Sequence, residues 1–123
     1  MKLGSNKIVV LLGEWEGQRL AIATNRAHIA QENPKILAVS LPKTSKAYSF
    51  IAKSRTAKIF LVECKNAKGK KLVEQLEKDL DPSNLELGEQ YVEARLELVV
   101  ELDSVDVLFL RLLQTSPSYS YEH

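Results

Sequence analysis

Apolar and polar residues alternate most strictly near the C-terminal end of the chain. From Gln90 onward every second residue is apolar, and those between are mostly charged. The apolar residues are Val92, Ala94, Leu96, Leu98, Val100 and Leu102. A period of two predicts a strand with one buried face and one wet face. The run Val105–Leu113 after Asp103 fits a strand or a helix. We favour a strand, which gives a C-terminal antiparallel hairpin.

Three largely apolar runs predict further strands. They are Lys7–Leu12, Lys35–Leu41 and Ile59–Val62. They are rich in aliphatic and β-branched residues and show little alternation, which is typical of strands inside a sheet. We therefore expect a mixed β-sheet.

Two segments fit more than one structure. Gln18–Ala23 alternates like a strand, although its apolar spacing also fits a helix. We favour a strand there, followed by a helix from about Asn25 to Glu32 with Thr24 as N-cap. The segment Lys46–Ser54 fits a short helix or a strand.

A second helix is predicted over Lys70–Leu80, where an apolar stripe recurs at helical spacing before Asp81-Pro82 ends it. With 123 residues, the chain is expected to form a single α/β or α+β domain over 1–114. The domain would contain two or three short helices. Residues 115–123 are expected to form a flexible tail.

The net charge of +1 conceals a strong segregation of charge. Residues 33–71 carry ten basic residues and one acid, whereas residues 72–123 carry three basic residues and twelve acids. Either the two parts neutralise each other, within the fold or between subunits, or the basic part meets an anionic partner. We favour a non-enzymatic protein that binds nucleic acid through residues 43–71 with strong salt dependence. The expected contacts are Lys43, Lys46, Lys53, Arg55, Lys58, Lys68, Lys70 and Lys71.

A short motif offers a different function. The segment IFLVECKN places Glu63 and Lys65 two residues apart at the end of a buried strand. It resembles the active-site strand of the PD-(D/E)xK nuclease superfamily. The resemblance implies a metal-dependent nuclease in which Glu63 holds the metal and Lys65 positions water. That superfamily also uses an upstream acid, and none occurs between Asn33 and Val62. We therefore expect no catalysis, metal or cofactor.

Two further expectations concern location and assembly. Cys64 is the only cysteine, and no run approaches the ~20 apolar residues of a membrane span or forms a signal peptide. These features indicate a cytoplasmic protein that does not enter a membrane. The long C-terminal strands favour a homo-oligomer, so a protein–protein interaction or regulatory module is the other alternative.

Overall fold

The computed structural model describes residues 7–65 and 67–115. The strands are β1 (Lys7–Trp15), β2 (Gln18–Thr24), β3 (Ala27–Glu32), β4 (Lys35–Pro42), β5 (Thr56–Glu63), β6 (Asp79–Leu80), β7 (Val92–Glu101) and β8 (Val105–Thr115). The helices are α1 (Lys46–Ser54), α2 (Ala67–Val73) and the 3-10 helix η1 (Pro82–Asn84). All eight strands belong to one sheet, in the order β3-β4-β8-β7-β5-β1-β2-β6. Neighbouring strands pair antiparallel throughout the described residues.

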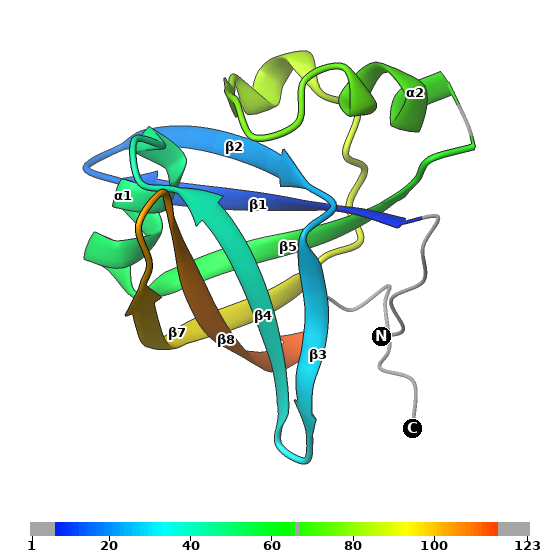
Figure 1. Ribbon diagram of the computed structural model, residues 1–123. Coiled ribbons are helices and arrows are strands. Elements are labelled where there is room, and N and C mark those ends of the chain that lie inside the picture. The colour runs from blue at the N-terminus through cyan, green and yellow to red at the C-terminus, as the bar shows by residue number, and fades with distance from the viewer. Residues whose placement is uncertain (1–6, 66, 116–123) are drawn as a thin grey trace.

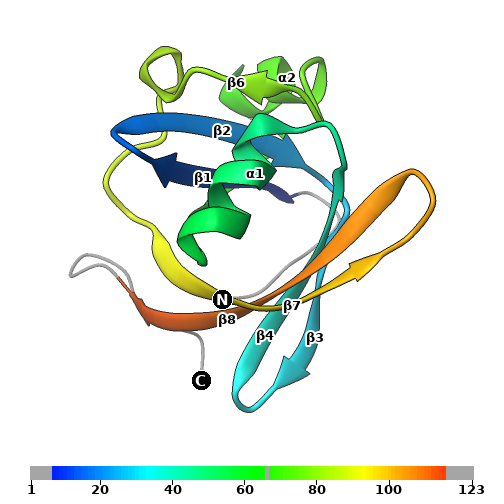
Figure 2. The ribbon, with the colours of Figure 1, turned by 90° about the vertical axis from the view of Figure 1, so that its left-hand side faces the viewer.

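The sheet curls into a barrel (Figures 1 and 2). β2 bends within two residues into β3, which then pairs with β4. A backbone hydrogen bond of 3.0 Å from Ser40 N to Arg26 O joins β4 to this bend. β2 pairs with β1, and its continuation β3 pairs with β4. The bend between β2 and β3 therefore closes the sheet into a barrel.

Helix α1 packs against β1 and β2 at one end of the barrel. Its residues Ala47, Phe50 and Ile51 are buried. β1 meets the helix at Gly13, where an added Cβ would lie 2.8 Å from the Ala47 carbonyl oxygen. The absence of a side chain at Gly13 therefore lets α1 approach the sheet closely.

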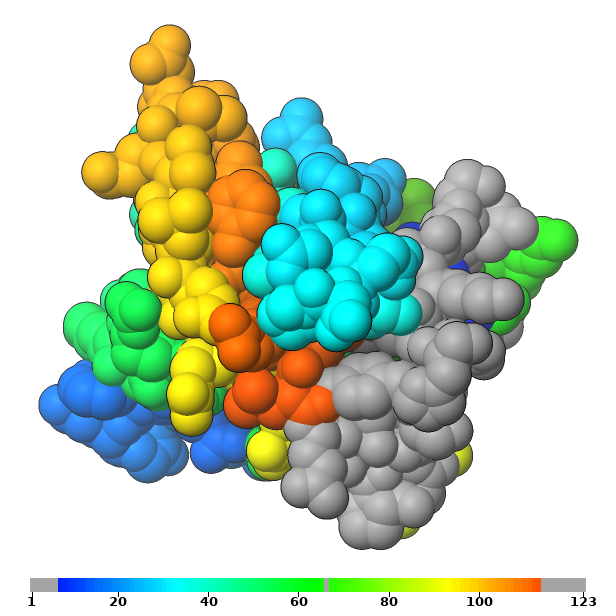
Figure 3. Space-filling view, turned by 90° about the horizontal axis from the view of Figure 1, so that it is seen from below, coloured from blue at the N-terminus to red at the C-terminus, as the bar shows by residue number. Residues whose placement is uncertain are grey.

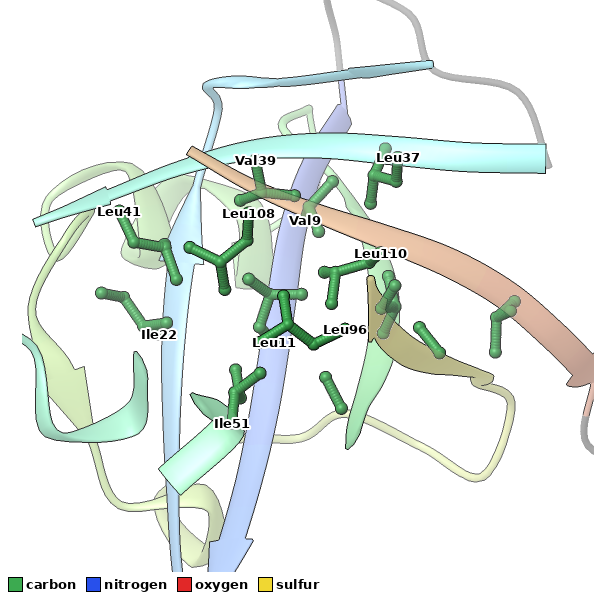
Figure 4. Packing of buried hydrophobic residues seen from close by; sticks show 14 of the residues in the cluster. Val9, Leu11, Ile22, Leu37, Val39, Leu41, Ile51, Leu96, Leu108 and Leu110 are labelled. Atoms are coloured by element: carbon green, nitrogen blue, oxygen red, sulfur yellow. The ribbon is translucent and has the colours of Figure 1, made fainter. Parts of the chain in front are cut away.

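The hydrophobic core has two parts, one on each face of β1. Residues that include Leu11, Leu96 and Leu110 fill the inside of the barrel (Figure 4). Ile8 and Val10 point the other way, into a second cluster that contains Leu72 of α2. Because β1 is buried on both faces, its sequence is apolar without alternation.

The predicted fold class is wrong. Over the described residues, the structure is an antiparallel barrel with two α-helices, instead of a mixed α/β or α+β sheet. The helix expected from Asn25 to Glu32 is strand β3, because its backbone pairs with β4 while Ala27 and Ile29 pack against the core. Lys46–Ser54 is a helix and Gln18–Ala23 lies in a strand.

The helix expected over Lys70–Leu80 is wrong in extent. Helix α2 ends at Val73, Glu77 has a left-handed backbone with φ 65°, and Asp79–Leu80 pair with β2. The C-terminal hairpin is present as β7 and β8. β8 includes Thr115, which the prediction assigned to the tail, and residues 116–123 lie outside the described residues. Among the described residues, no helix has the length and apolar character needed to cross a membrane.

Candidate functional site

The eight predicted nucleic-acid contacts do not share one surface. Lys46 and Lys53 lie on α1 at the barrel end, whereas Lys68, Lys70 and Lys71 lie on α2 outside β1 and β2 (Figure 1). Tertiary structure has divided the basic segment between two sides of the molecule.

Several of these basic groups have partners within the fold. Lys43 binds Asp106, and Lys58 Nζ lies 3.5 Å from Glu14 Oε1 and 5.1 Å from the ring centroid of Tyr91. The Arg55 guanidinium donates to the Leu96 carbonyl oxygen at 3.2 Å. Two ion pairs, Lys43 with Asp106 and Lys68 with Glu86, join the basic segment to the acidic segment within the domain.

The motif that resembles a nuclease does not assemble a metal site. Glu63 ends β5 opposite Lys7 of β1, and the Lys7 ammonium group binds its carboxylate. The hydrogen bond from Lys7, followed by its charge, lowers the pKa of Glu63. Among the described residues, no group of three or more His, Cys, Asp and Glu side chains is arranged to hold a metal ion.

The N-terminus of α1 is a natural anion site, and the protein fills it with its own carboxylate. Asp79 accepts hydrogen bonds from Lys46 N at 2.7 Å, Ala47 N at 3.0 Å and Ser45 Oγ at 2.8 Å. Pairing of β6 with β2 brings Asp79 there across more than thirty residues of sequence. Asp79 could not be predicted as a partner of α1, because nothing in the local sequence marks this contact. A second anion cannot use these donors while Asp79 holds them.

A second polar cluster fastens α1 to the barrel. The Tyr48 hydroxyl donates to Asp106 Oδ2 at 2.6 Å, and the Lys43 ammonium group binds Oδ1. Lys43, and then Tyr48, lowers the pKa of Asp106 by hydrogen bonding to its charged form. Burial, followed by the neighbouring carboxylate, raises the pKa of Tyr48. These groups satisfy one another and join α1 and β8 to Lys43, the residue that follows β4.

Three cavities follow β5 along its length. The first, of about 310 Å³, is lined by Glu14 and Glu93, and its Lys58 is paired with Glu14. The second, also about 310 Å³, has Glu89 as its charged residue. Negative charge in both makes them unfavourable for an anionic ligand.

The third cavity, of about 190 Å³, differs in its chemistry. We call it the α2 pocket, and its lining residues are Val62, Ala67, Lys68, Lys71, Leu72, Gln75, Asn84, Leu85, Glu86 and Leu87. Its apolar wall stands beside two ammonium groups and two side-chain amides. Lys68 Nζ lies 3.7 Å from Glu86 Oε2, and both side chains are exposed, so this ion pair is weak. The pocket suits a ligand with an apolar part and an anionic part.

Of the residues that line the α2 pocket, only the lysines were predicted from the sequence as ligand contacts. Lys68 and Lys71 were among the predicted anion contacts, whereas Asn84, Leu85 and Leu87 were not singled out. The segment from Asp81 to Asn84 was interpreted only as the end of a helix. Its polar residues signal a turn, and nothing local indicates which surface the turn will cover.

Similar proteins are found by structure and not by sequence. No family model matches the chain, and no curated protein sequence matches it. An FMN-binding protein from Thermus thermophilus, solved with p-hydroxybenzaldehyde, is similar with a TM-score of 0.73 and 13% identity, over 89% of this chain and 70% of that one. The flavin reductase of styrene monooxygenase from Pseudomonas putida S12 gives a TM-score of 0.70 and 14% identity, over 90% and 79%. Flavoredoxin from Methanosarcina acetivorans gives 0.71 and 15%, over 99% and 75%.

These likenesses establish the fold and overturn the predicted functions. The barrel has the architecture of FMN-binding proteins and flavin reductases, so the resemblance of IFLVECKN to the PD-(D/E)xK superfamily is wrong. The interpretation of Glu63 and Lys65 as nuclease residues, which depended on that resemblance, is therefore wrong too. The prediction of nucleic-acid binding is wrong as well, since the neighbours in fold are flavin proteins.

Proposed function

We propose that this protein binds a flavin nucleotide and serves in flavin-related redox chemistry. The observation that carries the proposal is the likeness of its barrel to several FMN-binding proteins and flavin reductases over about nine-tenths of the chain. Fold alone does not determine function, so the side chains of the chain must also suit the ligand.

Flavin mononucleotide joins an apolar-faced ring system to a doubly charged phosphate. In the α2 pocket, the ammonium groups of Lys68 and Lys71 suit the phosphate, and Gln75 and Asn84 supply amide donors. The pocket is smaller than the roughly 300–1,000 Å³ of whole-ligand sites. We therefore assign only the phosphate-bearing end of the flavin to it.

The alternatives for the phosphate are less favourable. The donors at the α1 N-terminus are bound by Asp79. In the other two cavities along β5 glutamates outnumber basic residues, whereas in the α2 pocket Lys68 and Lys71 outnumber Glu86. Lys68 would exchange its exposed partner Glu86 for the phosphate, at little energetic cost.

A bound flavin supplies electron or hydride transfer, and the protein supplies binding and orientation. In this chain, Lys68 and Lys71 would hold the charged end, while Leu72 and Leu85 keep water from one wall of the pocket. Glu86 lies at the same wall and would repel a ligand that carries further negative charge beside its phosphate.

Titration of the full chain with FMN, FAD and riboflavin, followed by flavin fluorescence, tests the proposal. We expect FMN to bind more tightly than riboflavin, because only FMN carries the phosphate. Each of Lys68→Glu and Lys71→Glu should weaken FMN at least about tenfold, the scale of one lost charge-assisted hydrogen bond. Lys53→Glu on α1 is the matched control and should leave FMN binding unchanged.

The possible outcomes test the proposed function and the proposed site separately. If none of the three flavins binds at about 100 µM, a weak affinity for any cofactor, the proposed function is wrong. If FMN binds and neither α2 variant weakens it, the function stands and the assignment to the α2 pocket is wrong.

A further inference from the structure

The hairpin of β7 and β8 exposes an unusual amount of apolar surface. Leu98, Val100 and Leu102 are 56%, 40% and 51% exposed. Phe109 pairs with Leu98 and Val107 pairs with Val100, so their side chains lie on the same side of the sheet. We call this surface the hairpin face, and it consists of Leu98, Val100, Leu102, Val105, Val107 and Phe109.

A β-bulge creates this face. Up to Leu96, the even-numbered residues of β7 point into the barrel and are buried. The register shifts between Leu96 and Leu98, and beyond it Val99 packs against the core while its neighbours turn outward. The sequence alternation placed all six even-numbered apolar residues on one buried face, which is wrong for the last three. A one-residue shift moves every later side chain to the opposite face.

The tip of the hairpin projects beyond the barrel (Figure 2). In the space-filling view from below, the tip extends past the rest of the molecule as the light orange atoms (Figure 3). Contiguous apolar surface of this kind is rare on a monomer and marks interaction sites.

The two ends of the hairpin face carry opposite charge. Arg95 and Arg111 lie opposite each other at the barrel end, on the exposed side of the hairpin. Arg111 is paired with Glu97, whereas Arg95 has no ion pair among the described residues. Asp103 is exposed at the tip. The face is thus basic at one end, apolar along its length and acidic at the other end.

We propose that a second copy of this chain covers the hairpin face through the same face, with the two hairpins running in opposite directions. This arrangement stacks apolar side chains on apolar side chains about a twofold axis near Val100. It sets the tip carboxylate of Asp103 in each copy beside Arg95 of the other. A dimer with both tips at the same end would instead leave Arg95 unpaired and bring the two Asp103 carboxylates together. The proposal is independent of flavin binding.

Sedimentation velocity of the full chain, from about 1 to about 100 µM, tests the proposal. We expect the wild type to dimerise, and Leu98→Lys and Val100→Lys to weaken the dimer more than tenfold. Val73→Lys is the matched control, since Val73 is 49% exposed on α2, and it should leave the dimer unchanged. All three sites are at the surface, so circular dichroism should report folded protein for each variant.

A charge swap tests the direction of the hairpins. Arg95→Asp and Asp103→Arg should each weaken the dimer, and the double variant should recover most of the loss because the pair is restored in reverse. A wild type that stays monomeric, or a dimer that tolerates Leu98→Lys and Val100→Lys, would overturn the interface. A double variant no better than the single variants would overturn the opposed arrangement.

Discussion

Gly69 holds α2 against the end of β5, and Gly69→Ala should release it. A Cβ at this position would lie 1.9 Å from the Glu63 carbonyl oxygen and 2.7 Å from Cys64 Cα. Both are backbone atoms, so no side-chain rotation can relieve the clash. Because real Cβ contacts are essentially never under 3.0 Å, the helix must move by about 1 Å or more.

The cost of that movement follows from what α2 buries. Leu72 is 5% exposed and belongs to the outer core cluster, and returning such a side chain to water costs about 1.5–3 kcal/mol. We expect Gly69→Ala to lower the free energy of unfolding by about 2–3 kcal/mol. The same movement distorts the α2 pocket, so FMN binding should weaken as well.

Urea denaturation followed by Trp15 fluorescence and circular dichroism measures this loss. Gly17→Ala is the matched control, because Gly17 has a φ of +78° and a Cβ added there would meet nothing within 4 Å. Its cost is limited to the left-handed backbone, about 1–2 kcal/mol. If Gly69→Ala is no more destabilising than Gly17→Ala and unfolding in urea stays cooperative, the close approach of α2 to β5 is not a stabilising contact.

Three further predictions concern α1, the pH dependence of stability and the core. Asp79→Ala should destabilise by about 1–2 kcal/mol in urea denaturation, because α1 loses its bound carboxylate, and Asp79→Asn should cost less. The contribution of Asp106, whose pKa is lowered by Lys43 and then Tyr48, is complete at neutral pH and is lost as the pH falls through that lowered pKa. Asp106→Asn should therefore flatten the fall of melting temperature as the pH drops below the ordinary pKa of an aspartate. Leu11→Ala, at a site with 0% exposure, should cost about 2–5 kcal/mol of unfolding free energy by leaving a cavity.

The sites show where prediction from sequence ends. Lys68 and Lys71 were recognised as anion contacts by charge alone, and they line the α2 pocket. Glu63 was assigned to a metal, but the register of β1 and β5 places Lys7 against it. Asp79 was not noticed, because its partners lie more than thirty residues away. Partners of charged groups depend on strand register, which the local sequence does not encode.

Local pattern by itself determined the strands whose burial follows their sequence: Ile8–Leu12 is apolar and buried throughout, and the first half of β7 alternates in both polarity and burial. It also determined that Lys35–Leu41 would be a strand, because an extended apolar run buries best in a sheet. Tertiary structure decided that Ala27–Glu32 is a strand, since pairing with β4 outweighed the helical preference of its alanines. It also decided that Leu98, Val100 and Leu102 face outward, through one bulge in the pairing with β8. Periodicity is a property of a few consecutive residues, whereas closure of the barrel and the register of its strands arise from contacts between distant segments.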